Sequence, residues 1–507
     1  MDSRQATFPG YMVYTCCVAV LTSLSIGYVI GSPNVPEKAM RGLEGECGPN
    51  PYTKENGFYN CFYYADLLWG FAVGSFCLGA LITGLAGGTI QNMYGRRMTM
   101  FIANIFFIVG ALLLGFTAHQ AQFIIGRIVV GMGCGLGGVV VPTYLGEAAT
   151  IKSRGTMGAC FQLLIVIGIL ISNAIGLGLN TPPLWRVNLA LLGIPALIQL
   201  ALLASMVESP KWLITKNRAT EARAALQKLR GDTNIDAEFT DMIVMILKSE
   251  AVESTTSESG PDGALKDDSA YEEKLKVDNP TTVDLSNYRP PKSYSVVYLF
   301  KSECCKIAIQ GILLHFFQQA CGINGLIYYS TTFLDAVFGK DKTKYLTVGT
   351  SALNLVSTIL SVYLIDKTGR RTLLLISSAG CAISSVLLFS GGYADIGNLV
   401  VVSVFLFIGF FAIGLGPIPW LMLSELLPSY ALSPASAVAT SVNWSTNFVI
   451  GLVFPTIAKG MGDGTFILFG AICVACFFYV WFFLPETKGR RVEDIMAEKG
   501  IGPRTDI

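Results

Sequence analysis

The stretch N-M-Y-G-R-R, Asn92 to Arg97, decides the architecture of this chain, because it returns as D-K-T-G-R-R, Asp366 to Arg371. Each copy lies between two long apolar segments, as a short loop between membrane-spanning helices would. Two glutamates also recur, Glu147 as Glu425 and Glu208 as Glu486, each 278 positions later. The glycine of the loop recurs 274 positions later. Three repeats in nearly one register indicate a duplicated bundle.

Composition places the chain in a bilayer. Of its 507 residues, 52% are hydrophobic and 14% are charged, whereas soluble domains carry about 25% charged residues. The mean hydropathy is +0.54. Lys plus Arg total 36 against 35 for Asp plus Glu, so a net charge of +1 offers no field that would attract a nucleic acid. We expect a membrane protein with no nucleic-acid partner.

A helix needs about 20 apolar residues to cross a bilayer, and twelve segments qualify. They are residues 11–33, 66–90, 99–117, 122–144, 157–179, 184–206, 306–336, 345–365, 372–391, 399–423, 436–458 and 465–484. The expected fold class is therefore an all-α polytopic membrane protein with twelve transmembrane helices in two pseudo-symmetric six-helix bundles.

Four regions follow from this division. Residues 1–214 form the N-terminal six-helix domain, 215–301 a linker, 302–491 the C-terminal six-helix domain, and 492–507 a tail. The linker begins with a helical stretch, A-T-E-A-R-A-A-L-Q-K-L-R. It continues as a Ser, Asp, Glu and Pro-rich tract, residues 249–293, whose composition predicts a mostly disordered segment.

Lys and Arg in the short loops set the orientation, since these residues favour the cytoplasmic side. Most of them lie on the side shared by both termini and the linker, which is therefore predicted to be cytoplasmic. We expect a multi-pass protein of the cell (plasma) membrane, with the vacuolar membrane as the alternative. Cys47 and Cys61 flank a polar loop on the opposite side. The sequence leaves open whether they form a disulfide there or remain two free thiols.

The sequence lacks the motifs that are typical of several other function classes. Gly133, Gly135 and Gly138 satisfy G-x-G-x-x-G, but they lie inside an apolar 23-residue segment, where small residues let helices pack closely. No phosphate-binding G-x-x-x-x-G-K-[ST] motif occurs, and His119 and His315 are isolated. We expect no enzyme activity, no cofactor and no metal site.

Charged residues at the loop ends predict a cytoplasmic latch between the two halves when the protein opens outward. Each exposed ion pair contributes only about 0 to 1 kcal/mol, but several together could favour one conformation. The alternative is a solvated basic rim, which explains the arginines but not the repeated glutamates. The predicted latch residues are Arg96, Arg97, Glu147, Arg154, Glu208, Asp366, Arg370, Arg371, Glu425 and Glu486.

Amide side chains in the apolar segments predict a ligand site. Gln318, Gln319 and Asn324 lie mid-segment beside Gly322, which is expected to break the helix. A buried amide without a partner is costly, so either a bundle-stabilising hydrogen bond or a ligand must satisfy it.

Three further spans contribute to this set. Gln162 and Asn354 bring amides to a comparable depth, and Pro417 and Pro419 interrupt span ten just before Trp420. Broken helices mark binding sites in transporters. Amides that donate and accept, with an indole for an apolar face, suit a neutral, hydroxyl-rich ligand.

The motifs now resemble those of the sugar porter branch of the major facilitator superfamily, most closely the facilitative glucose transporter family. The likeness runs over residues 11–491 without the linker. It rests on G-R-R at 95–97 and 369–371, P-T-Y-L-G-E at 142–147, R-G at 154–155, E-S-P-K-W-L at 208–213, Q-Q-A-C-G-I-N at 318–324, G-P-I-P-W at 416–420, N-W at 443–444 and P-E-T-K-G-R at 485–490.

This resemblance implies facilitative hexose transport, with glucose as the expected hexose, by alternating access through a twelve-helix fold with a helical linker. It implies two sets of site residues. The sugar contacts would be Gln162, Gln318, Gln319, Asn324, Asn354, Trp420 and Asn443, and the outer gate would be Tyr328 and Tyr329. The implied partners are a small-molecule hexose and membrane lipid, and no obligate protein partner is inferred.

The resemblance also bears on coupling. Proton-coupled members carry an Asp where this chain has Val29, which favours a uniporter. The alternatives are a proton symporter that uses another carboxylate, such as Asp66, and a non-transporting sugar sensor, although the tail after the last span is short. Of the remaining membrane-embedded ionisable residues, Arg127 is expected to be structural and His315 to pack or hydrogen-bond.

Two departures from the family pattern have consequences. Animal glucose carriers typically have a Glu near the position of Ala412, so the preferred hexose stays open. The family pairs the Glu of each latch with an Arg seven residues later, and Glu147 has Arg154. Seven residues after Glu425 stands Leu432, which predicts a weaker second-half latch and a larger inward-open population.

Overall fold

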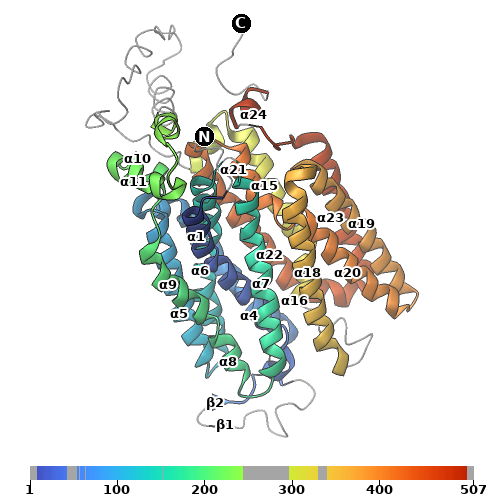
Figure 1. Ribbon diagram of the computed structural model, residues 1–507. Helices are drawn as coiled ribbons and strands as arrows, with labels where there is room; N and C mark the ends of the chain where they lie inside the picture. Colours follow the sequence, from blue (N-terminus) through green and yellow to red (C-terminus); the bar gives the residue numbers. More distant parts are fainter. Residues whose placement is uncertain are drawn as a thin grey trace.

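The computed structural model describes residues 8–42, 54–55, 58–62, 64–150, 152–243, 296–328, 340–490 and 492–498. It is a bundle of long helices standing side by side (Figure 1). Within those residues, eleven helices are long and apolar enough to cross a membrane. We name the end of the bundle that holds the two G-R-R turns, at Gly95 and Gly369, the G-R-R end.

The first half supplies six of these spans, as predicted. Its helices are α1 (Gly10–Ala19), α2 (Leu21–Gly31), α3 (Glu37–Arg41), α4 (Asp66–Tyr94), α5 (Arg96–Gly115), α6 (Gln120–Ala148), α7 (Arg154–Gly178), α8 (Trp185–Ala190), α9 (Gly193–Leu202) and η3 (Leu203–Ser205). The helix pairs α1/α2 and α8/α9 each make one span, the latter continued through η3.

Close packing explains the glycine-rich stretch of α6. A Cβ added at Gly131 would lie 1.8 Å from Phe76 O, and one at Gly135 would lie 2.3 Å from Ala80 O. Both oxygens belong to the α4 backbone, so α6 and α4 approach as only small residues allow. The predicted packing role is confirmed.

The second half supplies five spans of full length, one of them interrupted between residues 413 and 418, and a further, shorter one that is broken at Gly322. Its helices are α14 (Val296–Lys301), α15 (Cys305–Ala320), α16 (Ile323–Tyr328), α18 (Lys340–Thr368), α19 (Arg370–Tyr393), α20 (Gly397–Ile413), α21 (Ile418–Leu426), α22 (Ser429–Met461), α23 (Gly464–Phe483) and α24 (Val492–Glu498). Span seven is divided between α15 and α16 at Gly322, whose φ is +89°, at the break that the sequence predicts. That break leaves α15 with 16 residues, fewer than a spanning helix needs.

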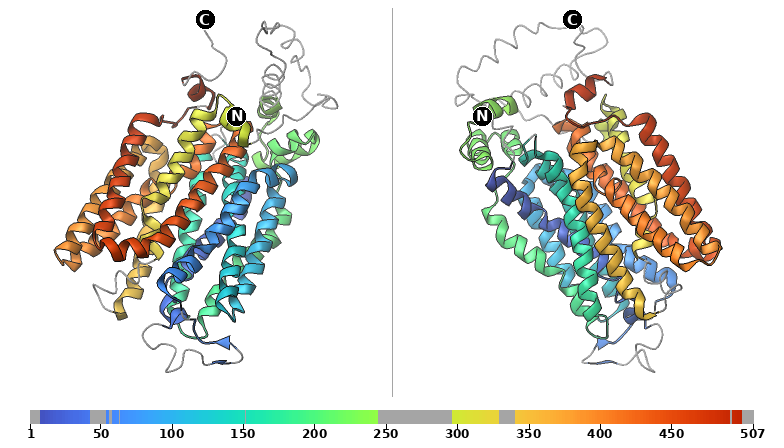
Figure 2. Two further views of the ribbon diagram at one scale, coloured as in Figure 1. Left: turned by 180° about the vertical axis from the view of Figure 1, so that it is seen from behind. Right: turned by 45° about the vertical axis from the view of Figure 1, so that its right-hand side comes forward.

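Two hydrophobic cores correspond to the two halves. One is built mainly from residues 12–229 and the other from residues 299–495, and Trp420 and Trp444 of the second half pack into the first core. The halves meet where α4 lies along α22 and α7 lies along α18 (Figure 2). Phe71 and Phe448, with ring centroids 6.1 Å apart, belong to the first of these contacts.

The linker starts with the predicted helix. That helix, α11, spans Ala219–Arg230 and packs with α10 (Pro210–Thr215) into a separate apolar cluster outside the spans. Arg230 anchors it: its guanidinium pairs with Glu238 over 2.8 Å and donates to Ala148 O over 2.8 Å, at the end of α6. The predicted disordered tract, residues 249–293, lies outside the described residues.

The polar loop after the first span contains two short antiparallel strands, β1 (Lys54–Glu55) and β2 (Phe58–Tyr59). Cys61, just beyond β2, is disulfide-bonded. Its predicted partner, Cys47, lies outside the described residues, so the pairing stays a prediction.

Candidate functional site

Four of the predicted amide side chains form one hydrogen-bonded group, which we call the amide cluster: Gln318, Gln319, Asn324 and Asn443. Asn443 stands at its centre. Its Nδ2 donates to Gln318 Oε1 over 2.7 Å, and its Oδ1 accepts from Gln319 Nε2 over 2.9 Å. Asn324 Nδ2 donates to Gln319 Oε1. None of the four is more than 9% exposed, so the amides of α15, α16 and α22 satisfy one another out of water.

Helix breaks on two sides shape this cluster. The sharp turn at Gly322 separates Gln319 from Asn324, and a Cβ at Gly322 would lie 2.6 Å from the Phe469 ring. The break between α20 and α21 frees the carbonyl of Gly416, which accepts from Gln318 Nε2 over 2.7 Å. A continuous helix would have used that carbonyl internally. The breaks predicted from Gly322 and Pro417 are both present.

Trp420 lies beside the amide cluster. Its ring packs against His315, with centroids 4.7 Å apart and an interplanar angle of 85°, and against Phe161 of α7 at 5.0 Å. His315 Nδ1 lies 3.4 Å from Asn443 Nδ2. His315 therefore packs and hydrogen-bonds, as the sequence predicts, and it connects the indole to the amides.

The other two predicted contacts lie apart from this cluster. Gln162 follows Phe161 on α7, and within the described residues no hydrogen bond joins it to the amide cluster. Asn354 of α18 lines a cavity of about 10 Å³, which has room for about one water molecule. Asn173 of α7 lines the same cavity, and its Nδ2 donates to Ser351 Oγ over 2.9 Å. That bond joins the two halves on the side of the bundle away from the G-R-R end.

The predicted outer gate falls largely outside the described residues. Tyr328 is the last residue of α16, but its side chain is not described, and Tyr329 lies outside the described residues altogether. The gate therefore stays a prediction.

Arg127 of α6 is fully buried next to the predicted coupling position. Its NH1 donates to Val29 O over 2.7 Å, its NH2 to Val73 O over 2.7 Å, and its guanidinium lies 4.7 Å from the centroid of the Phe76 ring. Arg127 thus ties α6 to α2 and α4 through backbone carbonyls, which agrees with the structural role expected from the sequence.

The first G-R-R turn is built around two carboxylates. Gly95, with φ +90° and ψ 172°, has a conformation that essentially only glycine adopts. It turns the backbone so that Arg96 N and Arg97 N donate to Glu208 Oε1 and Oε2 over 3.0 and 3.1 Å. Glu208 thereby accepts hydrogen bonds from two N–H groups at the start of α5 that have no partner within the helix. Its negative charge also interacts favourably with the positive end of the helix dipole. Burial raises the pKa of the Glu208 carboxyl, although those N–H bonds oppose the shift.

The side chain of Arg96 completes this arrangement. Its Nε and NH2 donate to the two oxygens of Glu147, each over 2.8 Å, and its NH1 donates to Gln91 O over 3.2 Å at the end of α4. One arginine thus joins the ends of α4, α5 and α6.

The second G-R-R turn repeats this geometry. Arg370 N and Arg371 N donate to Glu486 over 2.9 and 3.1 Å. The Arg370 guanidinium pairs with Glu425 over 2.9 Å and donates to Ile365 O over 3.1 Å. One hydrogen bond breaks the symmetry, because Thr487 Oγ1 also donates to Glu425.

The ion pairs Arg96–Glu147 and Arg370–Glu425 each join helices of one half, so neither of them links the two halves in this structure. The physical role of each pair here is to brace the ends of three helices within a half. The latch between the halves, expected when the protein opens outward, stays a prediction. Arg154 begins α7 with a half-buried side chain, and Asp366 lies in α18 without a described side chain.

Uncharged groups join the halves at the G-R-R end. Gln91 Nε2 donates to Ser433 Oγ over 3.2 Å, and Ser433 Oγ donates to Gly88 O over 3.3 Å. These bonds link α4 to α22. With the Asn173–Ser351 bond on the other side, the halves are in polar contact towards both ends of the bundle.

Sequence reasoning missed several polar residues of this central region. Asn447 follows Asn443 by one helical turn on α22 and is 1% exposed, and Asn34 and Asn173 line the small cavity. The four-residue spacing of Asn443 and Asn447 was a usable signal, because such residues share a helix face. Nothing in the sequence indicated which way Asn34 and Asn173 face.

Comparisons with known proteins agree with this architecture. The family model described as "Sugar (and other) transporter" matches residues 15–261 and 264–498. The chain is 32% identical to facilitated glucose transporter member 2 of Sus scrofa, covering 96% of this chain and 94% of the relative. It is 33% identical to member 4 of Homo sapiens, covering 100% of this chain and 96% of the relative.

Solved structures of a bacterial xylose transporter share the fold. The proton:xylose symporter XylE, of the major facilitator superfamily, bound to 6-bromo-6-deoxy-D-glucose matches with a TM-score of 0.78 at 24% identity, covering 96% of this chain and 99% of that one. The inward-open conformation of XylE from E. coli matches with a TM-score of 0.65 at 26% identity, with coverages of 96% and 99%. From the family match and the near full-length relatives, we conclude that this chain belongs to the sugar (and other) transporter family.

Proposed function

We propose that this protein is a hexose uniporter that works by alternating access, with the G-R-R end on the cytoplasmic side of the plasma membrane. Its family is one of transporters and not of enzymes. In this proposal Gln162, Gln318, Gln319, Asn324, Asn354, Trp420 and Asn443 contact the sugar, and Tyr328 and Tyr329 close the outer gate.

The observation that carries the proposal is the amide cluster with Trp420 beside it. Gln318, Gln319 and Asn443 already exchange hydrogen bonds with one another, so sugar hydroxyls can replace those bonds without leaving an amide unpaired. Each exchange yields little net free energy, roughly 0.5 to 1.5 kcal/mol per bond. Weak binding suits a carrier, which must release its cargo.

The distribution of carboxylates favours uniport over proton coupling. The buried carboxylates among the described residues are Glu37, Glu147 and Glu238, and each pairs with an arginine. At the coupling position stands Val29, whose backbone oxygen, rather than a side chain, accepts from Arg127. We therefore place proton symport second, with Asp66 at the start of α4 as its candidate carboxylate.

Transport in liposomes tests this choice. Purified protein should exchange labelled hexose across the membrane without a pH gradient or a membrane potential. A strict requirement for a proton gradient would replace uniport by symport, and Asp66→Asn would then be expected to abolish the requirement.

The variant Gln318→Ala tests the site. It should weaken sugar binding by about 1 to 3 kcal/mol, the cost of unpaired hydroxyl or amide groups in a dry site. The matched control is Gln310→Ala, on the same helix α15 but outside the amide cluster. Unchanged transport affinity in Gln318→Ala, or an equal loss in both variants, would remove Gln318 from the site.

The preferred hexose is proposed to be glucose. Ala412, which is 1% exposed on α20, stands where animal glucose carriers have a Glu, so it removes one hydrogen-bonding group from the region. Competition among glucose, fructose, galactose and mannose, in cells without carriers of their own, would show which sugar is transported best.

A further inference from the structure

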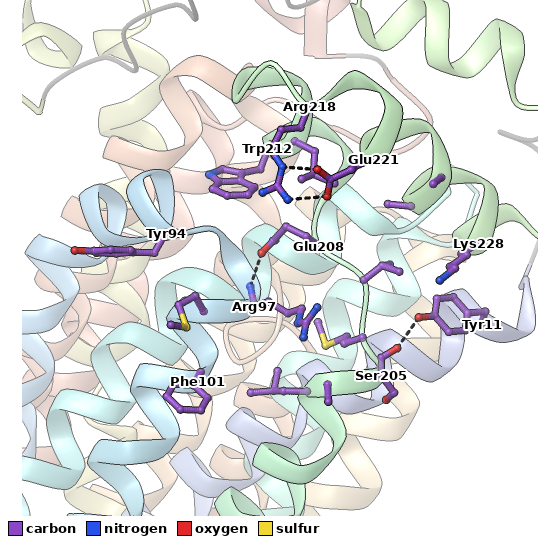
Figure 3. A pocket seen from close by; sticks show the side chains of 18 of the residues that line it. Tyr11, Tyr94, Arg97, Phe101, Ser205, Glu208, Trp212, Arg218, Glu221 and Lys228 are labelled. Atoms are coloured by element: carbon purple, nitrogen blue, oxygen red, sulfur yellow. Dashed lines mark hydrogen bonds and ion pairs between the residues drawn. The ribbon is translucent and has the colours of Figure 1, made fainter. Parts of the chain in front are cut away.

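A second cavity lies away from the amide cluster, on the outside of the first half at the G-R-R end (Figure 3). Its volume is about 720 Å³. The cavity is bounded by the start of α5, the end of α9 with η3, and the helices α10 and α11. It therefore straddles the ends of spans three and six and the first helices of the linker.

Two cations face this cavity without an anionic partner among the residues that the structure describes. Arg97 and Lys228 line it from α5 and α11, and among the described residues no carboxylate pairs with either side chain. Figure 3 shows both side chains directed to the same space.

The other charged groups of the cavity are already paired. Arg218 binds Glu221 over 2.6 Å. Both oxygens of Glu208 accept backbone N–H groups, including that of Arg97. The charged side chains that line the cavity are three cations, Arg97, Arg218 and Lys228, and two carboxylates, Glu208 and Glu221, so its lining keeps a net charge of +1.

The lower wall of the cavity is apolar and open towards the membrane. Met98 and Phe101 lie in the first turns of the α5 span and are 49% and 40% exposed. Leu200 and Leu203 line the opposite side from the end of span six. Tyr11 OH donates to Ser205 O over 2.6 Å and closes one edge. The site thus combines a cationic rim with an apolar wall where the spans end.

We propose that this cavity binds the headgroup of an anionic phospholipid, with its phosphate between Arg97 and Lys228 and its acyl chains against Met98 and Phe101. Basic residues next to membrane spans attract anionic lipid. The apolar wall favours a lipid over a free anion, because the acyl chains of a lipid cover Met98 and Phe101 and a soluble anion does not. Two cations favour an acidic headgroup over a zwitterionic one.

Native mass spectrometry of the purified full-length protein tests this proposal. The protein is titrated with dioleoyl phosphatidylserine and, separately, with dioleoyl phosphatidylcholine. Phosphatidylserine should bind more tightly, and Arg97→Gln combined with Lys228→Gln should weaken that binding about 30-fold, since each basic residue near the surface contributes about a factor of five.

The matched control is Lys301→Gln combined with Lys306→Gln, which removes two exposed charges of the second half that do not line the cavity. It should leave phosphatidylserine binding unchanged. Arg97→Gln keeps its backbone bond to Glu208, so an unchanged melting temperature would show that the test variant is folded. Arg97→Lys combined with Lys228→Arg keeps both charges and should keep the binding.

Three outcomes would overturn the proposal. The first is equal binding of phosphatidylserine by the test variant and the control. The second is equal binding of the two lipids by the unmodified protein. The third is binding of inorganic phosphate or inositol hexakisphosphate that depends on Arg97 and Lys228 while phosphatidylserine does not bind, which would identify a site for a soluble anion. None of these readouts depends on which sugar is transported.

Discussion

The two G-R-R turns hold the ends of their helices by the same backbone device, but they differ in the side chains that complete it. In both, a glycine of positive φ lets a distant glutamate accept two N–H groups at the start of a helix. In the first half, Glu147 accepts both of its hydrogen bonds from Arg96 as far as the described residues show. In the second, Glu425 is shared between Arg370 and Thr487.

This difference separates what duplication preserved from what it left to vary. The turn needs glycine for its backbone angles, an arginine to reach the preceding helix end, and a carboxylate to accept N–H groups. Those parts recur in register. The donors around the paired carboxylates, Glu147 and Glu425, only have to satisfy the lone pairs that the arginine leaves free. A donor such as Thr487 can therefore be present in one half and absent from the other.

The largest effect is expected from removing the buried arginines. Arg96→Ala leaves Glu147 buried without its partner and should lower the free energy of unfolding by about 3 to 5 kcal/mol. Arg370→Ala should cost less, about 2 to 3 kcal/mol, because Glu425 keeps Thr487 and its side chain is 12% exposed against 8% for Glu147.

Chemical unfolding in detergent, followed by tryptophan fluorescence, measures both losses. The double variant Arg96→Ala with Glu147→Ala should recover part of the first loss, because no unpaired charge remains. A loss in Arg370→Ala as large as that in Arg96→Ala would mean that Thr487 does not compensate.

The glycines should behave alike in the two halves. A Cβ at Gly95 would lie 2.5 Å from Glu208 Oε2, and one at Gly369 would lie 2.6 Å from Glu486 Oε2. Each change to Ala should therefore cost about 2 to 3 kcal/mol of unfolding free energy, from backbone strain and displacement of the carboxylate. Gly462→Ala is the control, because Gly462 has φ +54° but nothing within 4 Å of an added Cβ. If Gly462→Ala costs as much, strain alone explains the effect and the carboxylate contact contributes nothing.

A smaller effect is expected when the second half is given the arginine that the first half has. Leu432→Arg places a cation seven residues after Glu425, as Arg154 follows Glu147. Because both residues belong to the second half, this pair would add to the brace within that half. A partly exposed ion pair contributes about 1 kcal/mol or less, so the free energy of unfolding should rise by about that amount.

Chemical unfolding measures this gain, and pulsed electron spin resonance distances between labels at the G-R-R ends of the two halves measure the inward-open population of the unmodified protein. Leu432→Gln controls for loss of the leucine from the second core, where Leu432 is partly buried. Equal stability of Leu432→Arg and Leu432→Gln would contradict the expected gain, and an outward-open resting state in the unmodified protein would contradict the predicted larger inward-open population.

The smallest effect concerns pH. Burial raises the pKa of Glu208 in the folded protein, so the folded state binds a proton more readily than the unfolded chain. The stability from this proton is present at low pH and is lost as pH rises through the raised pKa. Lowering the pH from about 7 to about 5 should stabilise the unmodified protein relative to Glu208→Gln by about 1 kcal/mol or less. Parallel unfolding curves at both pH values would exclude this contribution.

Much of the fold could be read from local signals. Apolar length located the spans, the repeat divided them into halves, and Gly322 and Pro417 marked the helix breaks. The helix over residues 219–230 was also evident, because its residues are strong helix formers. The candidate site was harder. The amides were identified because a buried amide needs a partner, but their partners are far apart in sequence, as for Gln318 and Asn443.

The sequence by itself determined the class of protein, its two halves, the helix breaks and the residue types of the candidate site, because each depends on composition, spacing or local backbone preference. Only the tertiary structure decided which groups meet. It showed that the arginine–glutamate pairs brace each half from within, and that Gln91, Ser433, Asn173 and Ser351 connect the halves. It also placed Arg97 and Lys228 at one cavity although 131 positions separate them. The physical reason is that helix packing sets contacts between distant segments, and those contacts leave no local pattern in the chain.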